Sequence, residues 1–123
     1  ETKFGVQIQA IGYDRWNALS TAQKLEKAGH NLIEVKQHSS VLHPPTKLLR
    51  EKILSHEFKY TNNRLLEINF QNARCVYDTN KNQYVNKKKS TGKVDMVVSI
   101  INATYLLQQD VFLNQMDFIV QSF

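Results

Sequence analysis

The strongest constraint on the fold is a change in hydrophobic periodicity between residues 6 and 36. From Val6 to Asp14 the side chains alternate between two faces, as a β-strand requires. From Asn17 the apolar residues follow a helical spacing that stops at Gly29, a natural C-terminal cap. Residues 31–36, NLIEVK, form a second short apolar run. A strand, a helix of about a dozen residues and another strand predict a βαβ unit with parallel strands, and therefore an α/β sheet.

The next residues predict a second helix and a less regular segment. Pro44 and Pro45 end a predicted loop at residues 37–43 and open a helix, because proline is tolerated in the first helical turn. The apolar residues predicted for the buried face of this helix are Leu48, Leu49, Ile53 and Leu54. Residues 65–77 have no decisive period, and they predict either a strand or a short helix that leads into a strand.

The last part of the chain predicts an exposed loop and a long helix. Residues 78–92, DTNKNQYVNKKKSTG, are polar and cationic, which favours an exposed loop. Residues 94–107 carry apolar side chains at helical spacing on several sides, so we expect most of the circumference of this helix to be covered. We expect residues 1–123 to form a single domain, with residues 110–123 as an apolar C-terminal tail.

Composition narrows the class of protein. The sequence is 41% hydrophobic and 22% charged, as in ordinary soluble globular proteins, and no apolar run approaches the roughly 20 residues of a membrane-spanning helix. The single cysteine, Cys75, cannot form an internal disulfide, which fits a reducing compartment. The formal net charge of +5 favours a polyanionic partner, and a basic domain with no nucleic-acid role explains the charge equally well.

Two aspartates lie at the ends of predicted elements. Asp14 follows the first strand and precedes a helix, where an aspartate commonly caps free backbone N–H groups. The same position is where ligands gather in open α/β sheets, outside the carboxyl ends of the strands. Asp95 lies in the first turn of the last helix, where a carboxylate interacts favourably with the helix dipole. Either aspartate has a purely structural explanation.

The two aspartates together predict a metal site. Hard cations such as Mg²⁺ and Mn²⁺ are bound by carboxylate oxygens from separate elements, and pairs of such ions support phosphodiester cleavage. Such a site usually needs three or more acids, and Asp78, Glu34 and Glu67 are further candidates, each better explained as a loop or strand-edge charge. The lysines just before Asp95 are candidates for phosphate contact or form a solvated loop: Lys87, Lys88, Lys89 and Lys93.

Other chemical motifs are absent from the sequence. It contains no GxxxxGK[ST] loop for ATP, and its four histidines lack the HExxH spacing of a zinc site. Cys75 has no catalytic signature beside it, and we expect it and Trp16 to lie in the core.

Five segments occur in order over residues 6–107: IGYDRWNA, LIEVKQ, the proline-led helix, LEINFQNARCVYD and KKKSTGKVDMVVSIINA. Together they resemble the C-terminal nuclease domain of the tailed-phage terminase large subunit, and the first and last segments are the most specific. The resemblance implies a ribonuclease H-like fold with a mixed sheet and flanking helices. It also implies a Mg²⁺- or Mn²⁺-dependent endonuclease that cuts concatemeric viral double-stranded DNA during genome packaging.

The resemblance also implies roles and partners. Asp14 matches the family's acid at the end of the fourth strand, and Asp95 matches its acid at the start of the last helix, so both are implied metal ligands. The implied partners are DNA and, in the intact protein, the ATPase domain, the small terminase subunit and the portal. The implied location is the cytoplasm of a bacterial host, with no membrane partner.

The sequence departs from the family pattern at its start. The family's remaining essential aspartate lies on the first strand, upstream of the residues present here, and the first three strands and the ATPase motor are absent as well. We therefore expect weak or absent nuclease activity in this chain. We also expect an unpaired sheet edge beside Asp14 that leads to self-association, aggregation or local rearrangement.

Two other functions remain open at this point. One is a non-catalytic module that binds DNA or docks on the portal. The other is a different ribonuclease H-like nuclease, such as a resolvase.

Overall fold

A computed structural model describes the backbone of residues 5–122 and the side chains of residues 5–16 and 18–109. The chain divides into two compact units, Glu1–Gln37 and His38–Phe123, and each is described by itself. The prediction of a single domain with a tail at residues 110–123 stays a prediction, since the tail's side chains lie outside the described residues.

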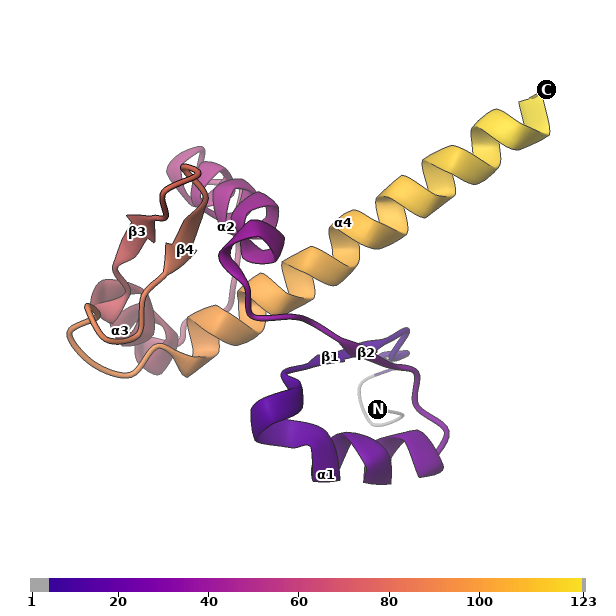
Figure 1. The fold of residues 1–123 in the computed structure, drawn as a ribbon, viewed down its shortest axis with the longest axis horizontal. Helices are drawn as coiled ribbons and strands as arrows, with labels where there is room; N and C mark the ends of the chain where they lie inside the picture. The colour runs from indigo at the N-terminus through magenta and orange to yellow at the C-terminus, as the bar shows by residue number, and fades with distance from the viewer. Residues whose placement is uncertain (1–4, 123) are drawn as a thin grey trace. The chain divides into compact units, whose positions relative to one another are not determined.

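The first unit is a βαβ unit, as the periodicity predicts. Strand β1 (Ile11–Tyr13) pairs in parallel with β2 (Leu32–Glu34), and helix α1 (Arg15–Lys27) connects them (Figure 1). Backbone hydrogen bonds extend the pairing at both ends, from the Ile11 N–H to the Asn31 carbonyl and from the Val35 N–H to the Tyr13 carbonyl, each at 2.8 Å. The helix ends before Gly29, whose φ of 96° lies in the left-handed region that glycine adopts at no steric cost.

Two expectations for the first unit are wrong. The strand does not begin at Val6, because β2 is only three residues long and leaves residues 6–10 without a ladder partner among the strands that the structure describes. Trp16 is 92% exposed and is not a core residue. It lies in the first turn of α1, before a kink at Ala18, whose φ of −136° and ψ of 15° are not helical.

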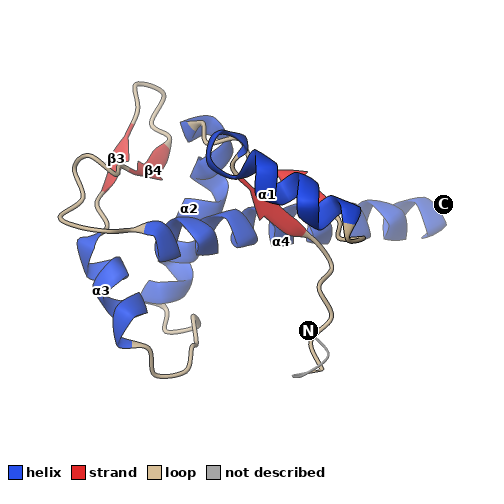
Figure 2. Ribbon diagram, turned by 90° about the horizontal axis from the view of Figure 1, so that it is seen from below, coloured by secondary structure: helices blue, strands red, loops and turns tan. Residues whose placement is uncertain are grey.

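The second unit packs three helices and a hairpin. Helices α2 (Ser39–Leu54) and α4 (Asp95–Ser122) cross, and α3 (Arg64–Asn72) lies beside the first turns of α4 (Figures 1 and 2). Strands β3 (Cys75–Tyr77) and β4 (Gln83–Val85) form an antiparallel hairpin whose register pairs Val76 with Tyr84. The core consists of Leu49, Val97 and Ile101, each at most 5% exposed.

Helix α2 begins earlier than the prolines predict. His38 caps it, since its Nδ1 accepts a hydrogen bond of 3.1 Å from the Ser40 N–H, and the helix therefore starts five residues before Pro44. The predicted loop at residues 37–43 is wrong, and both prolines lie inside the helix. Leu49 is buried as predicted, but Leu54 is 75% exposed.

Three further sequence predictions concern the β3–β4 hairpin and the segments beside it. Residues 65–77 are a short helix followed by a strand, the second of the two predicted alternatives. Residues 78–92 are not all loop, because they contain β4. Cys75 is exposed in the hairpin and is not a core residue.

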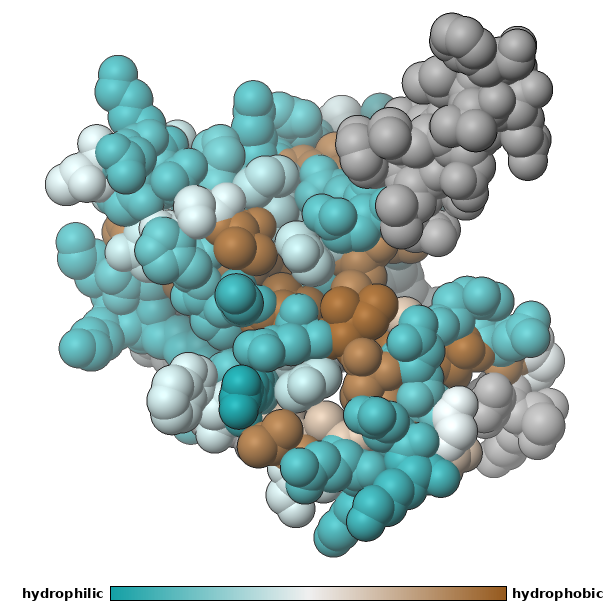
Figure 3. Space-filling model, turned by 45° about the vertical axis from the view of Figure 1, so that its right-hand side comes forward, coloured by the Kyte–Doolittle hydropathy of each residue, from teal (hydrophilic) through white to brown (hydrophobic). Residues whose placement is uncertain are grey.

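The last helix is covered over most of its circumference in the residues whose side chains the structure describes. Val97 and Ile101 are buried, most other side chains of residues 95–109 are partly buried, and an exposed stripe runs along Asp95, Ser99, Ala103 and Leu107, so over these residues the predicted coverage of most of the circumference is confirmed. On the face shown in Figure 3, hydrophilic side chains cover most of the surface, and hydrophobic ones appear between them.

Candidate functional site

Asp14 lies at the carboxyl end of β1 and caps α1. Its backbone is extended, with φ −93° and ψ 117°, and its Oδ1 accepts a hydrogen bond of 3.2 Å from the Trp16 N–H. The structural role predicted for this residue is therefore present. The side chain is half-buried at the end of a parallel strand pair, which is also where ligands bind in α/β sheets.

Asp95 is the first residue of α4, and its side chain is exposed. The helix starts with a hydrogen bond of 3.0 Å from the Val98 N–H to the Val94 carbonyl. Within the described part of the chain, no hydrogen bond or ion pair engages the Asp95 carboxylate. Both of its oxygens are therefore available to a ligand from solvent.

The four candidate lysines lie in a loop that local hydrogen bonds shape. Asn86 organises this loop: its Oδ1 accepts from the Lys89 N–H at 3.1 Å, and its carbonyl accepts from the Ser90 N–H at 3.0 Å. The Ser90 hydroxyl in turn accepts from the Arg74 N–H at 3.1 Å, which ties the loop to the start of the hairpin. All four lysines are exposed, and none forms an ion pair with a residue that the structure describes.

Asn86 is a residue whose role the sequence analysis missed. A side chain that accepts hydrogen bonds from the backbone a few residues later is typical of asparagine in turns. An asparagine directly before the KKKS run was the signal that predicts such a turn.

The structure brings some of the predicted residues together. The four lysines and Asp95 belong to the same unit, in which the lysine loop leads directly into α4. Asp14 belongs to the other unit, so the sharing of a cation by Asp14 and Asp95 stays a prediction.

The donor chemistry of the two aspartates fits a hard divalent cation, because carboxylate oxygens are the ligands that Mg²⁺ and Mn²⁺ prefer. Asp95 is exposed and Asp14 half-exposed, so both carboxylates are accessible from solvent. Among the described side chains, no group of three or more His, Cys, Asp or Glu residues could hold a metal ion. The carboxylates of Asp14 and Asp95 are thus the two predicted protein ligands of the cation.

Two of the other candidate acids, Asp78 and Glu67, have structural roles. Asp78 accepts hydrogen bonds from the Ser39 hydroxyl at 2.5 Å, the Asn82 N–H at 2.9 Å and the Asn80 N–H at 2.8 Å. These bonds, that of Ser39 above all, lower the pKa of Asp78 to about 2. Glu67 accepts from the Tyr60 hydroxyl at 3.2 Å. We therefore do not group Asp78 or Glu67 with Asp14 and Asp95 as metal ligands.

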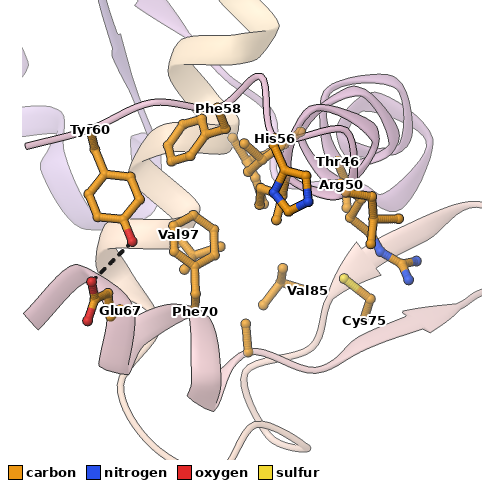
Figure 4. A pocket seen from close by; sticks show the side chains of 15 residues that line it. Thr46, Arg50, His56, Phe58, Tyr60, Glu67, Phe70, Cys75, Val85 and Val97 are labelled. Atoms are coloured by element: carbon orange, nitrogen blue, oxygen red, sulfur yellow. Dashed lines mark hydrogen bonds between the residues drawn. The ribbon is translucent and has the colours of Figure 1, made fainter. Parts of the chain in front are cut away.

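A pocket of about 690 Å³ opens in the second unit, and Glu67 is part of its lining. Figure 4 shows Phe58 and Phe70 at one side, the Tyr60–Glu67 hydrogen bond beside them, and Arg50 and Cys75 at the other. Partial burial raises the pKa of the Cys75 thiol. The pocket lining includes neither candidate aspartate and none of the four lysines.

Comparisons with known proteins identify the family. A sequence model of the terminase large subunit endonuclease domain matches residues 2–110. The crystal structure of the HK97 bacteriophage large terminase is 22% identical in sequence and superposes with a TM-score of 0.72 over 81% of this chain. That match covers 21% of the HK97 chain, so the present chain spans about a fifth of its length. No curated protein matches the sequence.

The observed fold and the matching family are those that the sequence resemblance implies. The structural similarity confirms a ribonuclease H-like α/β fold. In the part of the chain that the structure describes, no helix is long and apolar enough to span a membrane. Because the family sequence matches nearly the whole chain, the protein belongs to the endonuclease domains of the terminase large subunit.

Proposed function

We propose that this chain is part of a Mg²⁺- or Mn²⁺-dependent endonuclease that cuts concatemeric viral double-stranded DNA during genome packaging. The family match over residues 2–110 supports the reaction class. The observation that carries the proposal is the position of Asp95, an exposed carboxylate without a protein partner in the described structure, directly after a loop of four exposed lysines. A metal ligand next to cations is the arrangement that binding and cleaving a polyanion requires.

Each residue has a defined role in this proposal. Asp14 and Asp95 would hold the cation through their carboxylate oxygens. A bound divalent cation supplies an activated water and stabilises the negative charge that develops on the phosphodiester. Lys87, Lys88, Lys89 and Lys93 neutralise phosphate charge and hold the duplex near the carboxylates, without reading its sequence. Asp14 also caps α1, so its replacement affects both stability and metal binding.

The partners and the location follow from the same proposal. In an intact large subunit the nuclease domain would act with the ATPase domain, the small terminase subunit and the portal, in the cytoplasm of the bacterial host. A resolvase-like nuclease is disfavoured because the matching family is a terminase family.

The metal assignment is tested by titrating the chain with Mn²⁺ in a calorimeter. Asp95→Ala should weaken Mn²⁺ binding at least tenfold, since it removes one of two proposed ligands, and Asp14→Ala should do the same. Glu51→Ala is the control, because it removes an exposed carboxylate from α2 and should leave binding unchanged. Mn²⁺ binding that survives both aspartate substitutions would refute the site.

The nuclease activity of this chain is tested with plasmid DNA and Mn²⁺. We expect weak or no cutting, because two carboxylates position divalent ions poorly for hydrolysis. Any cutting that occurs should disappear in both Asp14→Ala and Asp95→Ala. Robust cutting in either variant would contradict the assigned roles.

The lysine loop is tested by measuring DNA affinity as a function of salt concentration. Replacing Lys87, Lys88 and Lys89 with glutamine should reduce the slope of log affinity against log salt by roughly one unit per lost phosphate contact. Lys24, Lys27 and Lys47 are exposed lysines on other elements, and their triple glutamine variant is the charge-matched control. Steep salt dependence without Mn²⁺ binding would instead favour the non-catalytic DNA-binding module.

A further inference from the structure

Two asparagines of α3 bind the backbone on both sides of Asp95. Asn69 and Asn72 are three residues apart and therefore lie on the same face of the helix. The Asn69 Oδ1 accepts a hydrogen bond of 3.2 Å from the Met96 N–H. The Asn72 Nδ2 donates a hydrogen bond of 3.0 Å to the Lys93 carbonyl. Asp95 thus lies between two backbone groups that the same neighbouring helix holds.

The Asn69 side chain is almost fully buried and has both of its polar ends engaged. It is 4% exposed, and its Nδ2 donates a hydrogen bond of 3.0 Å to the Leu65 carbonyl while its Oδ1 faces Met96. A backbone N–H requires an acceptor and a carbonyl requires a donor, so these two partners fix the orientation of the amide. Aspartate would keep only the acceptor, and an apolar residue would keep neither.

The first N–H groups of a helix have no acceptor within the helix, and α4 meets this need through Asn69 instead of a capping side chain of its own. The approach to the helix is held as well, since the Thr91 N–H donates to the Asn72 carbonyl at 3.0 Å. Gly92 lies so close that a Cβ there would be 2.7 Å from the Asn72 Nδ2. The segment from Thr91 to Met96 is therefore fixed against α3 at three successive points.

We propose that Asn69 and Asn72 are positioning residues for the Asp95 carboxylate. In this role they do not contact the cation. They hold the backbone of residues 93–96, which restricts the position of the Asp95 carboxylate. This inference rests on the proposed function, in which Asp95 is a metal ligand. Groups that orient metal ligands without contacting the metal commonly change metal affinity by one to two orders of magnitude.

The first test examines the hydrogen bond to Met96 without any metal. In Asn69→Ala, amide hydrogen exchange at Met96 should become roughly tenfold faster than in the wild type, because the N–H loses its acceptor. Exchange at Ile101, in the core region of α4, should change much less. Equal acceleration at both amides would show that the substitution merely destabilises the whole unit, and would overturn the inference.

The second test measures Mn²⁺ affinity by calorimetry in the full chain. Asn69→Ala and Asn72→Ala should each weaken binding on the order of tenfold. Asn69→Asp should recover part of this loss, because its carboxylate still accepts from the Met96 N–H. Leu66→Ala is the matched control, since Leu66 is a buried residue of α3 with no polar group to offer α4. A similar loss of affinity in Leu66→Ala would show that the asparagine variants weaken binding only by destabilising the fold, and would overturn the inference.

Asp95→Ala separates this inference from the proposed function. If Asp95→Ala weakens Mn²⁺ binding and both asparagine variants bind like the wild type, the positioning role is refuted and the metal site stands. If Asp95→Ala binds Mn²⁺ like the wild type, the metal site itself is refuted, and the positioning role falls with it.

Discussion

Gly92, which follows the lysines at residues 87–89 in the loop before α4, lies against the Asn72 side chain of α3. A Cβ at this position would lie 2.7 Å from the Asn72 Nδ2 and 2.9 Å from its Cγ. The Asn72 amide cannot move away without giving up its hydrogen bond to the Lys93 carbonyl. The glycine is therefore required by close packing, and its φ lies outside the left-handed region.

Gly92→Ala should destabilise the protein by about 1 kcal/mol, the usual net contribution of one hydrogen bond, because the Asn72 side chain has to shift. In an Asn72→Ala background, Gly92→Ala should lower the free energy of unfolding by clearly less, because the amide that the new Cβ would collide with is gone. Urea unfolding of the two single variants and the double variant measures this coupling. An equal cost of Gly92→Ala in both backgrounds would show that the collision is not its cause.

At the scale of elements, the β3–β4 hairpin is attached to α2 by polar side chains. Asp78, in the turn of the hairpin, accepts from the Ser39 hydroxyl at the start of α2. Gln83, which is 7% exposed, donates its N–H to the His43 Nδ1 at 2.9 Å and accepts at its Oε1 from Arg50 at 2.7 Å. These contacts explain why a polar segment forms an ordered strand.

The hairpin should weaken in acid because of Asp78. Its pKa in the folded chain is about 2, below the ordinary value of 3.8, so the ionised carboxylate stabilises the fold above about pH 4. This contribution is lost as the pH falls through the folded pKa. Asp78→Asn should therefore be less stable than the wild type at pH 7 and should show a smaller loss of stability between about pH 4 and pH 2.

Urea unfolding at a series of pH values measures this effect. Ser39→Ala should give an intermediate result, because the Ser39 hydroxyl makes the largest contribution to the lowered pKa of Asp78. The interpretation fails if Asp78→Asn and the wild type lose the same stability over this pH range.

At the scale of the whole molecule, the parallel strand pair has an open side. Among the strands that the structure describes, β1 pairs with β2 alone. Val6 and Ile8, just before β1, are 58% and 42% exposed. A strand edge flanked by exposed apolar residues can add a strand from another chain, so the self-association predicted from the sequence remains our prediction.

Light scattering over a range of concentrations should show a mass above that of the monomer, rising with concentration. Ile8→Lys should reduce this association, because a charge beside the edge opposes strand addition. Leu107→Lys is the matched control, since it replaces an exposed apolar residue on α4 and should associate like the wild type. A constant monomer mass at every concentration would contradict the prediction.

Local pattern was enough to predict the βαβ unit, the cap at Asp14 and the position of Asp95 at the start of a helix. Each depends on residues close in sequence: an alternation, a helical stripe that ends at Gly29, and a carboxylate beside free N–H groups. The family resemblance also comes from local segments, and the matching family confirms it.

Only the tertiary structure decided the features that depend on distant partners. Strand β4 was missed because its buried residue is the polar Gln83, whose hydrogen-bond partners, Arg50 and His43, lie on helix α2. Helix α2 starts at Ser39 because His38 caps it, although a proline pair normally marks a helix start. The attachment of the backbone around Asp95 to α3 could not be predicted from the sequence either. No periodicity reveals that Asn69 binds the backbone of Met96, which lies 27 residues later in the chain. Hydrogen-bond partners across the chain set these features, and sequence spacing does not record them.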